Sequence, residues 1–124
     1  MEQPLDLAVI GNCTTACLIN RQEDMVWSYW PNFDSSPLFS ALVDQDGSGA
    51  YDTGYWGFEV EGLATSEQSY RGNSAILETV LTDRQGQSIR ITDFMPRYRH
   101  HGRIFRDGMI IRKIEPLYGA PRIR

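Results

Sequence analysis

The sequence is poor in cysteine and in histidine, which limits both disulfides and metal sites. Only 2 of its 124 residues are cysteine and 2 are histidine. Cys13 and Cys17 lie in a segment we expect to be extended, where their Cα atoms are roughly 13 Å apart, too far for a disulfide. His100 and His101 are adjacent, so together they cannot complete a tetrahedral metal cage. We expect two buried, reduced thiols, no metal ion and no cofactor.

Long apolar runs and a leader sequence are also missing. No run approaches the ~20 apolar residues that span a bilayer, and residues 1–4 have neither the basic nor the apolar region of a signal peptide. We therefore expect a cytoplasmic protein without membrane contact. The hydrophobic share of 41% and the charged share of 23% are those of a globular chain, and residues 1–124 fit one domain or a fragment of one.

Basic residues are scarce in the first three quarters of the chain. Residues 1–96 carry 4 basic and 14 acidic side chains, whereas residues 97–124 carry 8 basic and 2 acidic ones. The basic loop at 97–108 includes Tyr98 and Phe105, a composition seen in nucleic-acid sites. The acidic body would repel a polyanion and no nucleic-acid motif is present, so we expect no nucleic-acid partner. A solvated loop and a surface facing an acidic partner domain both remain open.

Short runs of strand-forming residues are what the sequence does contain. The turn signal Asp83-Arg84-Gln85-Gly86 separates two of them and predicts a β-hairpin. Another hairpin is predicted around the polar residues 20–24, which lie between two short apolar runs. The strand-like runs are residues 7–10, 16–19, 25–30, 55–61, 74–82, 88–95 and 109–115.

One helix is expected among these strands. Asp34 or Ser35 can cap it and Pro37 suits its first turn, while apolar residues follow at near-helical spacing as far as Leu42. The absence of any long amphipathic helix excludes parallel strands with helical crossovers. The sequence thus predicts an all-β fold, an antiparallel β-sandwich with one short helix after the first hairpin. Its last strand, residues 109–115, leaves an apolar edge through which the fragment is expected to self-associate.

Four parts of the chain resemble, in order and spacing, the N-terminal domain of glycoside hydrolase family 15, which includes bacterial glucoamylase- and trehalase-like proteins. Two departures concern turns: residues 22–24 read Gln-Glu-Asp where the family has an Asp-Gly type turn, and the loop at 97–108 is more basic. The four parts are residues 7–16, residues 27–42 with the sequence WSYWPNFDSSPLFSAL, residues 77–79 with 92–96, and residues 111–119.

This resemblance implies a partial supersandwich that precedes an (α/α)6 barrel. Both catalytic glutamates belong to that barrel and lie outside this chain, so the chain alone is expected to have no catalytic residue. Enzymes of the family invert α-glucosidic bonds with an acid and a base roughly 6.5–9.5 Å apart. The implied partners are the C-terminal catalytic domain and, through it, an α-glucoside. The family's domain is longer than this chain, which we therefore interpret as a truncated or partial domain.

Trp30, Phe33 and Asp34 are the candidate substrate-proximal or interface residues. An aromatic ring can cover the C–H face of a sugar while a carboxylate accepts hydrogen bonds from its hydroxyls. The competing interpretation is structural, with Asp34 as a helix cap and the rings as packing.

Asp93 is a further candidate, and its structural interpretation is a carboxylate that accepts backbone N–H bonds from the turn after its strand. A contact with the barrel follows only from the resemblance. Glu59 and Glu61 alternate with apolar residues, which indicates a solvent-facing pair without acid–base chemistry.

Two other functions remain possible on the sequence alone. A free-standing carbohydrate-binding or protein-interaction module would need an exposed aromatic platform. An independent small enzyme has no supporting motif, because the sequence shows no nucleophile elbow, phosphate loop or metal-ligand spacing.

Overall fold

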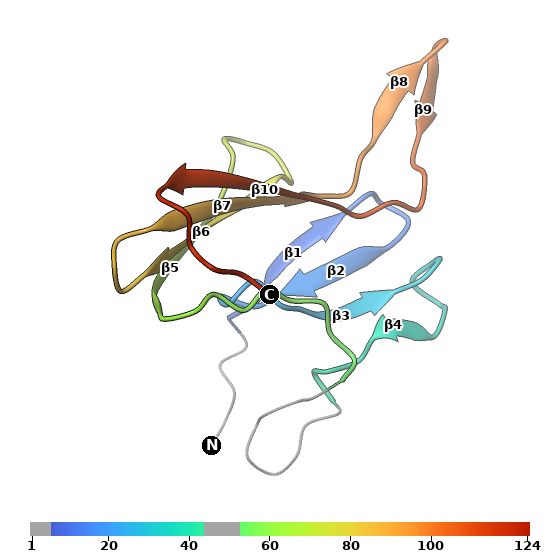
Figure 1. Ribbon diagram of the computed structural model, residues 1–124. Coiled ribbons are helices and arrows are strands. Elements are labelled where there is room, and N and C mark those ends of the chain that lie inside the picture. Colours follow the sequence, from blue (N-terminus) through green and yellow to red (C-terminus); the bar gives the residue numbers. More distant parts are fainter. Residues whose placement is uncertain (1–5, 44–52) are drawn as a thin grey trace.

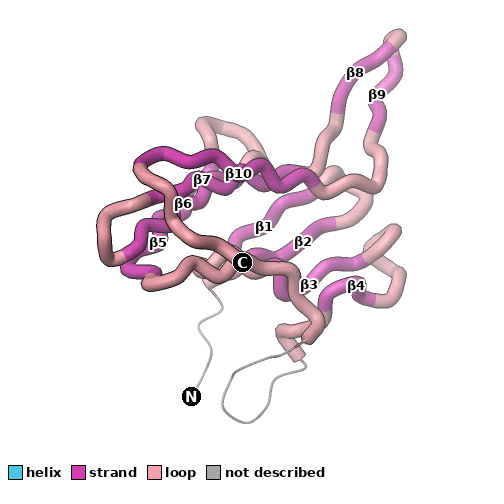
Figure 2. The backbone as a smooth tube through the Cα atoms, viewed as in Figure 1, coloured by secondary structure: helices cyan, strands magenta, loops and turns pink. Residues whose placement is uncertain are grey.

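The computed structural model describes residues 6–43 and 53–124, and within them it contains strands, turns and loops but no helix (Figure 1, Figure 2). Nothing in these two stretches could therefore serve as a bilayer-spanning helix. The strands are β1 (Ala8–Gly11), β2 (Ala16–Ile19), β3 (Met25–Tyr29), β4 (Pro37–Phe39), β5 (Leu63–Tyr70), β6 (Leu77–Asp83), β7 (Ser88–Phe94), β8 (Tyr98–His100), β9 (Arg103–Phe105) and β10 (Ile111–Tyr118).

The strands form two antiparallel four-stranded sheets that pack face to face. One has the order β1-β2-β3-β4 and the other the order β10-β7-β6-β5. A separate two-stranded sheet, β8-β9, projects from one end of this body (Figure 1). The predicted all-β fold, an antiparallel β-sandwich, is confirmed.

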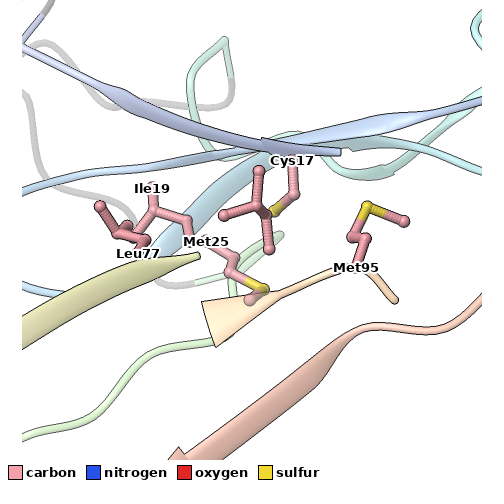
Figure 3. Close-up of a cluster of buried hydrophobic side chains, with 6 residues drawn as sticks. Cys17, Ile19, Met25, Leu77 and Met95 are labelled. Carbon is pink, nitrogen blue, oxygen red and sulfur yellow. The ribbon is translucent and has the colours of Figure 1, made fainter. Parts of the chain in front are cut away.

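The main core lies between the two sheets and follows from the alternation of side chains along the strands. Cys17, Ile19 and Met25 from the first sheet meet Leu77 from the second and Met95, which directly follows β7 (Figure 3). Each of these side chains is at most 5% exposed. Burying a side chain of this size stabilises the fold by about 1.5–3 kcal/mol. This cluster holds the sheets together.

A second cluster lies under the connection from β4 to β5. Val60 packs on Leu81, Ile89 and Ile91, which point inward from β6 and β7. The predicted strand at 55–61 is not a regular strand, since it pairs only through isolated bridges at Trp56 and Val60. The strand in this region is β5, whose polar sequence gave no alternating apolar signal.

The predicted short helix after the first hairpin is wrong, because its first residues form β4. Ser28 pairs with Phe39, and the N–H of Ser40 donates to the carbonyl of Gly54 at 2.9 Å. A helix this brief is marginal in water, so pairing with β3 prevails over local propensity. The N–H of Ser35 donates to the carbonyl of Asn32 at 3.0 Å, so Asp34 lies in a turn and caps no helix.

The hairpin predicted around residues 83–86 is confirmed. Leu81 pairs with Ile89 across it. Gly86 adopts a φ of 81°, which glycine tolerates without strain. The carboxylate of Asp83 accepts the N–H groups of Gln85 and Gln87, both at 2.9 Å, which closes the turn.

The last strand, β10, forms an edge of its sheet as expected, and it runs to Tyr118 rather than ending near residue 115. Self-association through this edge stays a prediction. The basic loop differs from expectation, because residues 97–108 contain the β8-β9 hairpin, with Tyr98 opposite Phe105.

The two cysteines occupy different environments, so the expectation that both are buried is wrong for Cys13. Cys17 is buried, and this burial raises the pKa of its thiol to about 12. Cys13 is exposed in the β1–β2 turn, where it adopts a φ of 72°.

We expect one fast-reacting thiol per native chain. A thiol reacts as its thiolate, so Cys17 stays protected at mildly alkaline pH while Cys13 is accessible. Titration with a chromogenic disulfide should count one thiol in buffer and two in denaturant, and Cys13→Ser should remove the fast phase. Two fast thiols in the native chain would contradict the burial of Cys17.

Candidate functional site

The loop from Trp30 to Ser36 joins β3 to β4 at the end of the sandwich from which the β8-β9 hairpin projects (Figure 1). The indole of Trp30 is half-buried against the main core cluster. Its other neighbour is Gly108: a Cβ there would lie 3.1 Å from Cζ2 and 3.2 Å from Cη2 of Trp30. Trp30 therefore packs directly on the backbone where the hairpin rejoins the body.

Phe33 and Asp34 occupy the outer part of this loop. Phe33 is 54% exposed and its ring lies 6.2 Å from that of Tyr29, tilted by 59°. Tyr29 in turn meets Trp27 edge-on, with ring centroids 5.7 Å apart and planes at 82°. Asp34 is exposed in the Asn32–Ser35 turn. The loop therefore offers one accessible ring and one accessible carboxylate.

The base of the hairpin is also tied to the β1–β2 turn. The side-chain amide of Asn12 donates to the carbonyl of Asp107 at 3.3 Å, and its oxygen accepts the N–H of Thr14 and of Thr15. A guanidinium nitrogen of Arg97 lies 2.9 Å from the sulfur of Cys13. Three segments distant in sequence thus meet at this end: the β1–β2 turn, the Trp30 loop and the hairpin base.

A groove of about 590 Å³ opens beside the hairpin base. Most of its lining is apolar, but Arg97 brings a guanidinium to it. The lining residues are Gly11, Asn12, Cys13, Ala75, Ile76, Phe94, Met95, Pro96, Arg97 and Tyr98.

The most polar part of the interior lies elsewhere, around Arg112 of β10. Its side chain is 1% exposed and pairs with two fully buried carboxylates. Nε donates to Asp93 Oδ1 at 2.8 Å and Nη2 donates to Glu23 Oε1 at 2.9 Å. Nη1 donates to the carbonyl of Trp56 at 2.7 Å. All three nitrogens of the Arg112 guanidinium therefore donate hydrogen bonds.

Aromatic rings lie against the same guanidinium. Cζ of Arg112 is 5.1 Å from the ring centroid of Trp56 and 4.7 Å from that of Phe58. Cation–π contacts in this range stabilise by about 2 kcal/mol when desolvated. These rings also exclude water, which strengthens the ion pairs below them.

Glu23 reaches this cluster from the β2–β3 turn. It adopts a φ of 75°, uncommon for a residue with a side chain. The Asn20 side chain accepts the N–H of Asp24 at 2.9 Å, and the Asn20 carbonyl accepts the N–H of Glu23 at 3.1 Å. Gln68 of β5 donates to the same carbonyl at 3.1 Å. This turn, where the sequence departs from an Asp-Gly type, thus supplies a buried carboxylate.

Two opposing effects act on the pKa of Asp93. Burial raises it, and the hydrogen bond and charge of Arg112 lower it, leaving a pKa above the usual 3.8. Burial outweighs the pairing with Arg112, so the interior favours a proton on Asp93 more than water does.

The structure does not bring all the candidate residues together. Trp30, Phe33 and Asp34 share one loop, whereas Asp93 faces Arg112 inside the sandwich. Asp93 therefore has a structural partner, though not the backbone N–H groups expected. Glu59 and Glu61 are exposed as predicted, paired with Arg124 and with Arg122. Within the ranges 6–43 and 53–124, no three His, Cys, Asp or Glu side chains form a metal-binding group.

Sequence reasoning missed Arg112, Glu23 and Gly108. An arginine within the apolar run of β10 was the one available signal, because a cation there must be paired if the strand is buried. Glu23 looked like an ordinary turn residue, and the closeness of Gly108 to Trp30 left no trace in either local pattern.

The chain was compared with protein-family models, with curated proteins and with solved structures, and nothing matched.

Arg112 and Asp93 should differ sharply in what their loss costs. Arg112→Met leaves two buried carboxylates without a cation and should destabilise the fold by about 3–5 kcal/mol at neutral pH. Asp93→Asn keeps an acceptor and leaves Arg112 paired with Glu23, so it should cost much less. Urea unfolding of both variants and of the wild type measures the free energy of unfolding that each substitution costs.

The same variants test the pKa of Asp93. Because its pKa is raised in the folded state, its contribution to stability is fully present below pH 3.8 and is lost as the pH rises through the folded-state value. The free energy of unfolding of the wild type, relative to that of Asp93→Asn, should therefore fall as the pH rises through the folded-state pKa of Asp93. An opposite slope would show that Arg112 prevails over burial.

Trp30→Ala should lower stability, because the indole packs on the core and on Gly108. We expect a loss of about 2 kcal/mol, below the ~3–5 kcal/mol of a fully buried tryptophan. Asp34→Asn, at an exposed turn, should change stability by less than about 0.5 kcal/mol. Thermal unfolding compares the two variants. An unchanged melting temperature for Trp30→Ala would show that the indole is not needed for packing and is available for ligand contact.

Proposed function

We propose that this chain is the non-catalytic N-terminal domain of a glucoamylase- or trehalase-like inverting α-glucoside hydrolase, where it packs against and shapes the catalytic barrel. The observation that carries this proposal is the meeting of the Trp30 loop, the β1–β2 turn and the hairpin base at one end of the sandwich. Two of the four segments that resemble the family contribute to this end. A domain that shapes another needs such a rigid, composite face.

The carboxylates support a non-catalytic role. A glycosidase acid and base must both reach the sugar. Asp93 and Glu23 are fully buried and bound by Arg112, whereas Asp34 is exposed to water. We therefore assign the hydrolytic carboxylates of the proposed enzyme to its barrel, and the loop from Trp30 to Ser35 to the border of its substrate subsite.

A free-standing carbohydrate-binding module is less well supported. Flat ring faces stack on the C–H faces of sugars, so such a module presents rings in a common plane. The planes of Trp27 and Tyr29 stand at 82° and those of Tyr29 and Phe33 at 59°. This row suits edge-to-face packing. Retention of the purified chain on insoluble starch would favour the module instead.

The purified chain should hydrolyse neither maltose, starch nor trehalose. Under the proposal both catalytic carboxylates lie in another domain, so mixing the chain with these substrates should release no glucose beyond a heat-treated control. Turnover clearly above that control, and lost in Asp34→Asn, would assign catalysis to this domain and remove the proposal.

A further inference from the structure

The hairpin that projects from the body has little support of its own. We call residues 97–107 the arm; they contain β8 and β9, which pair only with each other among the described strands. A lone two-stranded hairpin is marginally stable in water. Tyr98 is 48% and Ile104 is 53% exposed, so the arm leaves apolar surface uncovered on both faces.

The arm also carries four arginines but only one carboxylate, that of Asp107. None of its four arginines, Arg97, Arg99, Arg103 and Arg106, forms an ion pair with a carboxylate within the described ranges. Most other cations there do, including Arg21, Arg71, Lys113 and Arg124. The chain as a whole has a net charge of −4. Unpaired cations concentrated on a projection of an acidic protein indicate a surface for an acidic partner.

The arm is nevertheless held in a fixed orientation relative to the sandwich. The exit after β9 is fixed by the packing of Trp30 on Gly108 and by the hydrogen bond from Asn12 to Asp107. At the exit before β8, a guanidinium nitrogen of Arg97 lies 2.9 Å from the sulfur of Cys13. Within it, the rings of Tyr98 and Phe105 stack with centroids 5.5 Å apart and planes at 14°. A binding element that is already ordered loses less conformational entropy on association.

The groove continues this surface onto the body. Its apolar lining includes Ile76, Phe94 and Met95, and Arg97 and Tyr98 belong to both groove and arm. Arm and groove together thus offer apolar contact area bordered by guanidinium groups, the composition of a protein interface rather than of a nucleic-acid groove.

We propose that the arm and groove dock on a carboxylate-rich rim of the catalytic domain. This inference rests on the proposed function, and it adds which face of the chain makes the contact and by what chemistry. A cleft that holds an acid and a base for glycoside hydrolysis is itself acidic. Guanidinium groups pair with carboxylates through two parallel hydrogen bonds, which fixes orientation as well as attraction.

The test uses the whole chain and, as probe, the catalytic barrel of a bacterial family 15 glucoamylase produced without its own N-terminal domain. Titration calorimetry at low and at high salt measures the Kd. Arg99→Glu with Arg103→Glu reverses two charges on the arm. Arg84→Glu with Arg122→Glu makes the same change in net charge outside it and serves as the matched control. Equal melting temperatures establish that the variants fold.

We expect the arm variant to bind the barrel about tenfold more weakly than the wild type or worse, and with a smaller salt dependence. The control variant should bind like the wild type. Equal binding by the arm variant would overturn this inference and leave the proposed function standing. No binding by any form would overturn both. Tighter binding of single-stranded oligothymidylate than of the barrel, or arm-dependent dimers that exclude the barrel, would also overturn the inference.

Discussion

The pairing of Arg112 with Asp93 and Glu23 is the constraint on which the rest of the sandwich depends. An isolated charge in an apolar interior is far too costly to persist, so each carboxylate requires Arg112, and Arg112 requires at least one of them. Arg112 and Asp93 come from the neighbouring strands β10 and β7 of one sheet, and Glu23 comes from the β2–β3 turn of the other. The apolar clusters hold the sheets together but do not fix their relative orientation. The ion pair between Arg112 and Glu23 fixes this orientation, because it joins a strand of one sheet to a turn of the other.

The sequence patterns that predicted the fold correctly were those contained in a single hairpin, that is, in two strands and the turn between them. The hairpin around Asp83 and Gly86 is specified by β-branched runs and a turn sequence, and the structure has it as predicted. The polar strand β5 carries no such pattern. Its Gln68 side chain is used by the β2–β3 turn, a demand set by a segment 48 residues away along the chain. Likewise β4 is a strand because β3 offers it hydrogen bonds, which a window of local sequence cannot reveal.

The candidate site divides in the same way. Phe33 and Asp34 were identified from local chemistry, and both are accessible in the structure. The surroundings of Trp30 and Asp93 depend on Gly108 and Arg112, partners that only the folded chain brings near. Residue type was therefore sufficient to select Phe33 and Asp34 as candidates, but it did not indicate Gly108 or Arg112. Whether each faces solvent or the interior was decided by contacts between distant segments, and these leave no periodic signal in a single sequence.

The distance along the chain between Glu23 and its cation has a consequence for synthesis on the ribosome. The two are separated by 89 residues, so the first sheet emerges long before β10 does. Until Arg112 has left the exit tunnel, Glu23 and Asp93 have no counter-ion, and burying them would be unfavourable. Burial of Glu23 together with its counter-ion therefore requires that the chain has been made as far as β10.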